Sequence, residues 1–354
     1  MNDAKAAQRT TPVVQAFRPA RRAVGSPEGL RYRCAVFAIV AVSAVLSAPS
    51  AAFAGDRYAL VVSGAAGGDQ YAEKYTAWRK AFTAILLDKF AYPPDRVVVL
   101  ADADEDGVRK STRENVQHAL ADFRKRVTKD DQLLVLLIGH GTTTDSDEAK
   151  FNLVGPDLTA GEWADLLRPI PGRLVFVNTT AASFPFMRKM SGRNRVVLTA
   201  TDSSAQQFET VFAEHFVKAF DTPAADVDKN GRVSIWEAFI FASAGVHAYF
   251  EQKGQLPTER PLIDDTGEGI GREAQTPGND GALARITYVQ PEPPLALPAD
   301  ASQAALVRRR AELEAQFEEL KARKENMAPD QYDAELEKLL IEIARVGAQL
   351  RTKS

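Results

Sequence analysis

The twelve residues from Asp226 to Glu237 have the residue types and spacing of an EF-hand calcium loop. Side-chain oxygens stand at positions 1, 3, 5 and 9, a glycine that permits the sharp turn stands at position 6, and position 12 is a glutamate. Position 7 would contribute its backbone carbonyl. The predicted ligands are Asp226, Asp228, Asn230, Arg232, Ser234 and Glu237. Calcium takes about six to eight oxygen ligands, so we expect Ca²⁺ to bind here in a structural role.

Two other acidic segments are weaker candidates for a metal site. The segment Asp102 to Gly107 begins like the same motif, but Arg113 stands where the twelfth-position ligand would be, which favours a solvated loop. The segment Asp264 to Gly269 is predicted to be a turn. The alternative is that its carboxylates help to coordinate a nearby ion.

A histidine between two glycines, Gly139-His140-Gly141, is the second feature with possible chemistry. It directly follows the apolar run 132–138, which reads as a buried strand. In parallel sheets, ligand-binding groups stand on the loops at the carboxyl ends of strands. The position therefore favours a site role for His140, whereas most single histidines are ordinary polar residues.

The elements around this motif alternate between apolar strands and amphipathic helices. Strands are predicted at 57–63, 96–100, 132–138, 173–177 and 195–200, and helices at 72–90 and 112–127. Ser111 is the expected N-cap of the second helix, with Glu114 at the capping-box spacing. Because continuous apolar strands alternate with helices, the predicted fold class is α/β, with a mostly parallel sheet sandwiched between helices.

Several of these segments together resemble the legumain- and caspase-type cysteine peptidases of the caspase-hemoglobinase fold. The similar segments are Gly139-His140-Gly141, 151–154, 158–167, 173–177, 195–201 and 208–220. The resemblance covers about residues 56–271, and its strongest part is the strand followed by Gly-His-Gly. It implies a Cys–His dyad in which the imidazole assists a thiolate nucleophile.

Carried over to this chain, the resemblance makes His140, with Gly141, the base position and places the nucleophile shortly after Val177. One alignment puts Thr180 at the cysteine position, and a second, which matches Ser183, puts Ala181 there. Neither supplies a thiol. Replacing a thiol by a hydroxyl raises the pKa of the nucleophile and greatly slows attack, so a non-catalytic relative is favoured. The resemblance also implies that the loop with Asp202, Ser203 and Ser204 shapes a pocket, with helix capping as the alternative.

The first 54 residues read as a signal peptide. Arginines at positions 18, 21, 22, 31 and 33 precede an apolar run, 35–46, and the segment ends in Ala52-Phe53-Ala54. The run is shorter than the roughly 20 residues of a membrane-spanning helix, so we expect cleavage, no stable membrane insertion, and a periplasmic or secreted product. The segment has seven basic and two acidic side chains, so its loss changes the formal net charge from −3 to −8 and disfavours nucleic-acid binding. It also contains Cys34, the single cysteine.

The predicted caspase-like domain, 55–289, is followed by a Pro-rich linker, 290–302, and a helical hairpin, 303–354. Apolar residues at coiled-coil spacing form two runs, Leu306 to Leu320 and Tyr332 to Leu350, which Ala328-Pro329-Asp330 separates. The hairpin either packs on the main domain or pairs with another chain.

Three functions are compatible with this sequence. The favoured one is an exported, calcium-stabilised pseudo-peptidase that binds peptide or protein partners. The second is an active peptidase or hydrolase of the same fold that uses Ser183 or Thr180 with His140. The third is a scaffold that self-associates through residues 303–354.

Overall fold

The computed structural model describes residues 55–143, 148–292, 295, 297–322, 324 and 327–353. The predicted leader therefore lies outside the described residues. Within them, no helix has both the length and the apolar character needed to cross a membrane.

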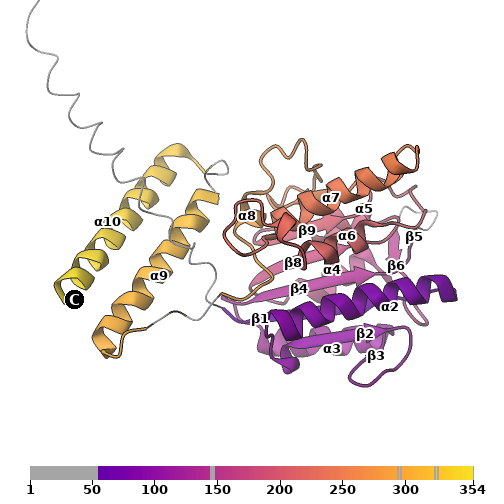
Figure 1. Cartoon of the computed structure of the whole chain (residues 1–354), viewed down its shortest axis with the longest axis horizontal. Coiled ribbons are helices and arrows are strands. Elements are labelled where there is room, and N and C mark those ends of the chain that lie inside the picture. Colours follow the sequence, from indigo (N-terminus) through magenta and orange to yellow (C-terminus); the bar gives the residue numbers. More distant parts are fainter. Residues whose placement is uncertain are drawn as a thin grey trace, which may run out of the picture. The chain divides into compact units, whose positions relative to one another are not determined.

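A seven-stranded sheet forms the centre of the main domain (Figure 1). Its strands are β1 (Arg57–Ser63), β2 (Val97–Ala101), β3 (Arg109–Lys110), β4 (Gln132–Ile138), β8 (Arg173–Asn178), β9 (Arg195–Thr199) and β10 (Leu262–Asp264). The order is β10-β9-β8-β4-β1-β2-β3, and only the β10–β9 pair is antiparallel. The carboxyl ends of β1, β4, β8 and β9 consequently lie side by side at one edge.

Side chains of alternating direction along each strand fill two separate cores. Ala59 and Val61 of β1 belong to the core that packs against α2 (Asp69–Ala84), α6 (Phe212–Ala219) and α7 (Ile235–Gln252). Leu60 and Val62 belong to the core against α3 (Arg113–Arg126), α4 (Ala160–Leu167) and α5 (Phe184–Met190). The central strands β1, β4, β8 and β9 are apolar at their inner positions because both faces of the sheet are covered, which confirms the predicted α/β class.

Some local predictions differ from the structure. The N-cap of α3 is Thr112, whose hydroxyl accepts from Asn115 N at 3.2 Å, and not Ser111, because the helix begins one residue later than its capping-box spacing suggested. The first helix begins at Asp69 and ends in a π-helical turn, η1 (Ile85–Lys89). A small antiparallel sheet after His140 was not predicted; it contains β5 (Gly141–Thr143), β6 (Ala149–Phe151) and β7 (Leu158–Thr159). Short segments η2 (Pro94–Arg96), η3 (Pro223–Ala225) and α8 (Ala282–Arg285) complete the domain.

The predicted C-terminal helical hairpin is present as α9 (Ala301–Ala322) and α10 (Pro329–Lys353). Leu313 and Leu320 of α9 and Tyr332 and Val346 of α10 are buried. These residues come from the two predicted apolar runs, so each run faces the other helix of the same hairpin.

Candidate functional site

Three strand ends place the predicted site residues at one edge of the sheet. Backbone hydrogen bonds continue the ladder past the strands: Gly64 N donates to Ile138 O (2.8 Å), Thr179 N to Leu137 O (3.1 Å) and Ala200 N to Asn178 O (3.0 Å). His140 follows β4 by one residue, and the segment from Thr179 to Ser183 follows β8, the next strand in the sheet. The structure thus brings the segments with the two predicted dyad positions to neighbouring strands.

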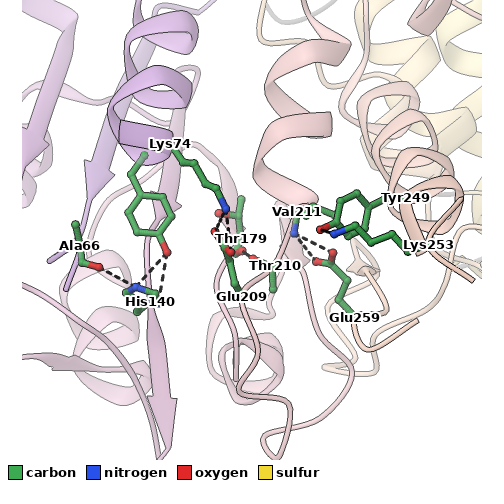
Figure 2. A network of polar contacts seen from close by, with 11 residues as sticks. Ala66, Lys74, His140, Thr179, Glu209, Thr210, Val211, Tyr249, Lys253 and Glu259 are labelled. Carbon is green, nitrogen blue, oxygen red and sulfur yellow. Dashed lines mark hydrogen bonds and ion pairs between the residues drawn. The ribbon is translucent and has the colours of Figure 1, made fainter. Parts of the chain in front are cut away.

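The His140 ring contacts residues that follow β1. Its Nε2 lies 2.9 Å from the Ala66 carbonyl oxygen, which can only accept, so Nε2 donates (Figure 2). The Tyr75 hydroxyl lies 3.4 Å from Nδ1, and the Tyr71 ring packs edge-on at 4.7 Å between centroids. Burial raises the pKa of Tyr75 well above its ordinary value, which keeps this hydroxyl neutral. Among the described residues, no hydrogen bond joins His140 to Thr180 or Ser183.

Thr180 is fully buried, and its hydroxyl already has two acceptors. Thr180 Oγ1 lies 2.8 Å from Asn178 Oδ1 and 3.0 Å from the Ala181 carbonyl oxygen. Gly141 packs directly against this turn: a Cβ at Gly141 would lie 2.2 Å from Ala181 O and 2.5 Å from Thr180 Oγ1. A glycine is therefore required at position 141 so that the turn after β8, which contains Thr180 and Ala181, can lie this close to the chain after His140.

Ser183 is also fully buried and has a structural set of contacts. Ser183 Oγ accepts from Ala200 N and Thr201 N, both at 3.1 Å, and lies 3.0 Å from Thr201 Oγ1. The hydroxyl holds the turn after β8 against the end of β9. A nucleophilic role would break these bonds.

The substitution Ser183→Ala is expected to lower the free energy of unfolding by about 1–3 kcal/mol, because the buried Thr201 N loses its acceptor and Ala200 N keeps only the Asn178 carbonyl. Chemical denaturation measures this difference. Ser191→Ala is a comparison in which the lost hydroxyl is a donor, to the Met187 carbonyl and the Asp264 carboxylate, so that no backbone N–H loses an acceptor. Equal stability of Ser183→Ala and the wild type would contradict the structural role.

Two buried side-chain amides beside this turn have no hydrogen-bond partner for their nitrogens in the described part of the chain. Asn178 Nδ2 lies at the end of β8, and Gln206 Nε2 lies in the loop after β9. The backbone carbonyl of Gln206 accepts from Ala182 N at 2.7 Å. Ala182 has a positive φ of 50°, a strained conformation for an alanine. Buried N–H donors without partners are positions where an oxygen acceptor from a ligand or a water would be stabilising.

Ion pairs surround the same edge. Lys74 Nζ of α2 lies 2.8 Å from Glu209 Oε1, as Figure 2 shows, and Arg260 lies 3.6 Å from Asp202 Oδ2. Ser203 Oγ accepts from Ala205 N at 3.1 Å, and the Ser204 carbonyl accepts from Thr143 Oγ1 at 3.3 Å. Phe208 in this loop is 69% exposed, which is unusual for a phenylalanine.

Glu259 is a buried carboxylate in this network that sequence reasoning missed. It is 1% exposed and accepts from Val211 N at 2.9 Å, at the start of α6 (Figure 2). Burial raises the pKa of Glu259 to about 7. Because the folded-state pKa is above the unfolded value, the stability that this group contributes is complete below about pH 4.5 and is lost as the pH rises through about 7.

We therefore expect Glu259→Gln to gain stability relative to the wild type between pH 5 and pH 8, by on the order of 2 kcal/mol. The glutamine oxygen can still accept from Val211 N, while the buried charge is absent. Denaturation at several pH values measures the difference, with Glu251→Gln on the exposed end of α7 as the control. A difference that does not change with pH would show that Glu259 stays ionised throughout.

The predicted calcium ligands come together in one loop. Carboxylate oxygens of Asp226, Asp228 and Glu237 lie within 4.8 Å of one another. Asp226 Oδ1 and Asp228 Oδ1 both accept from Asn230 N, at 3.1 and 3.0 Å, and Gly231 has the positive φ of 83° that the turn needs. Burial, with the charges of Glu237 and Asp226, raises the pKa of Asp228. A divalent cation would relieve this repulsion between carboxylates.

The remaining predicted ligands connect the loop to its surroundings. Ser234 and Glu237 form the capping box of α7, in which Ser234 N donates to Glu237 Oε2 at 2.8 Å. The Arg232 guanidinium stacks over the Tyr288 ring at 3.9 Å and donates to the Gln290 carbonyl oxygen at 2.7 Å. The loop that begins at Asp102 brings no comparable group of three carboxylates together in the described residues. Asp264 accepts from Gly267 N and Gly269 N, which is the predicted turn.

Comparison with protein-family models finds no match, and comparison with the curated proteins finds none either. The chain is similar to several solved structures. Protein GSU0716 from Geobacter sulfurreducens has a TM-score of 0.39 and 13% identity, over 59% of this chain and 92% of that one. The Drosophila initiator caspase Dronc has a TM-score of 0.39 and 12% identity, over 64% and 86%. The caspase drICE has a TM-score of 0.37 and 11% identity, over 60% and 88%. The likeness to each of these structures concerns the fold alone.

Proposed function

We propose that this protein is an exported, calcium-stabilised pseudo-peptidase that binds peptide or protein partners at the carboxyl ends of β1, β4, β8 and β9. The observation that supports this most is the state of the two hydroxyls near the nucleophile position. Thr180 Oγ1 and Ser183 Oγ are both buried and engaged with acceptors or donors other than His140. No cysteine occurs in the sequence after Cys34.

Binding without cleavage is compatible with the groups at this edge. A peptide offers backbone carbonyls, and Asn178 Nδ2 and Gln206 Nε2 are donors in need of an acceptor. Exposed Phe208 and the Tyr71 ring offer apolar contact, and the nearby ion pairs offer charge recognition. Export through the segment 1–54 and calcium binding between Asp226 and Glu237 are further parts of the proposal.

The test is incubation of the purified protein with a fluorogenic peptide library, with and without Ca²⁺, followed by binding measurements on the same library. We expect cleavage no faster than the blank, and peptide binding that His140→Ala weakens about tenfold, since the ring lies against Ala66 and Tyr75 in the middle of the edge. His118→Ala on the outer surface of α3 is the matched control. Turnover that is lost in His140→Ala or Thr180→Ala would overturn the proposal in favour of the hydrolase.

A further inference from the structure

Helix α10 has an apolar seam that the hairpin buries and, beside it, a second seam with apolar residues in the middle and charged residues at both ends. The first seam repeats at intervals of four and three residues and faces α9; its members are Tyr332, Leu336, Leu339, Ile343, Val346 and Leu350. A second seam with the same intervals starts one residue later, with Asp333, Glu337, Leu340, Ala344, Gly347 and Arg351. Every member of the second seam except Gly347 is exposed.

The middle of the second seam is apolar, with Leu340, Ala344 and Gly347 between the charged residues Asp333 and Glu337 on one side and Arg351 on the other. Leu340 is 47% exposed and the adjacent Ile341 is 51% exposed, and these are the two large hydrophobic side chains that α10 presents to solvent within the described residues. Ala344 follows one turn later and Gly347 and Ala348 two turns later, and these small residues leave room for a leucine from an opposing helix. Large residues on one half of the helix and small residues on the other are complementary when two such helices run antiparallel.

The charges of the seam fit the same antiparallel arrangement. If Leu340 of one copy lies opposite Ala344 of another, Asp333 lies opposite Arg351, and the two-fold axis repeats each pair. Neither Asp333 nor Arg351 has an ion-pair partner in the described part of the chain. A parallel arrangement would place Asp333 against Asp333 and Arg351 against Arg351, which is repulsive.

We propose that the second seam of α10 is an interface with a second copy of this chain, in which two hairpins associate antiparallel about a two-fold axis near residue 342. Leu340 packs against the small residues of the partner helix, and Ile341 lies at the flank. One Asp333–Arg351 ion pair forms at each end of the interface. The interface is independent of the peptide-binding edge and of the calcium loop. A single pair of helices buries less area than most stable dimers, so we expect a dissociation constant of about 10–100 μM.

A charge exchange tests this arrangement. Sedimentation of the purified protein between about 1 and 500 μM should show a monomer–dimer equilibrium. Asp333→Arg and Arg351→Asp should each weaken the dimer at least about tenfold, because each creates two like-charged pairs, and the double variant should restore dimerisation. Lys338→Glu, which changes the charge as much as Arg351→Asp but lies on a neighbouring face, should dimerise like the wild type.

Helix content by circular dichroism distinguishes loss of the interface from loss of the hairpin. With unchanged helix content, three outcomes would overturn the proposal: a wild-type monomer over the whole concentration range, a dimer that neither single variant weakens, or a double variant that stays monomeric.

Discussion

Addition of about 5 mM Ca²⁺ to the calcium-free protein is expected to raise its melting temperature by about 3–8 °C. Extracellular sites of this type have dissociation constants of roughly 10⁻⁴–10⁻³ M, so this concentration stabilises the folded state by about 1–2 kcal/mol through binding. The physical basis is the group of carboxylates of Asp226, Asp228 and Glu237, whose oxygens lie within 4.8 Å of one another. Differential scanning calorimetry with and without chelator measures the shift, and Mg²⁺ at the same concentration should give a smaller one.

Asp228→Asn should separate the effect of this loop on the stability of the calcium-free protein from its effect on calcium binding. Burial and neighbouring carboxylates raise the pKa of Asp228, so removal of its charge should leave the calcium-free protein at least as stable as the wild type. The gain from Ca²⁺ should nevertheless disappear, because a ligand is lost. Asp106→Asn, in the other acidic loop, should retain the full gain. The calcium assignment is wrong if the wild type and Asp228→Asn respond to Ca²⁺ alike.

Gly141→Ala is expected to lower the free energy of unfolding by about 3 kcal/mol or more. The added Cβ would lie 2.2 Å from the Ala181 carbonyl oxygen and 2.5 Å from Thr180 Oγ1, so the β8 turn must move away from β5. The first obstacle is backbone, which cannot rotate aside like a flexible side chain. The same displacement should weaken peptide binding at this edge.

Gly161→Ala is the matched control for this experiment. Gly161 lies in α4, and a Cβ there would meet its nearest atom, Thr159 Oγ1, at 3.7 Å, an ordinary contact. Alanine is a better helix former than glycine by about 1 kcal/mol, so this variant should be as stable as the wild type or more so. Urea denaturation of both variants gives the comparison. A Gly141→Ala protein as stable as Gly161→Ala would show that the turn after β8 lies elsewhere.

Local patterns identified the parts of the structure that depend on neighbouring residues in the chain. The apolar runs of β1, β4, β8 and β9 specified buried strands, because strands covered on both faces have consecutive apolar residues at their inner positions. The two heptad runs specified the hairpin, and the spacing from Asp226 to Glu237 specified a loop whose carboxylates converge. Cap positions were less certain, as Thr112 and Ser111 show, because adjacent hydroxyl residues satisfy the same pattern.

Contacts between distant segments were decided only by the tertiary structure. The sequence left Thr180 and Ser183 open as nucleophiles, and the folded chain engages their hydroxyls with Asn178 and with the end of β9. Tyr75 and Glu259 gave no sequence signal, since tyrosines on helices are commonly partly buried without any site role and glutamates in loops are usually solvent-exposed. The sequence by itself therefore determined the fold class, the hairpin and the absence of a thiol after residue 34. Strand order and register decided which polar groups face His140 and which form structural hydrogen bonds instead. No local sequence pattern encodes strand order or register.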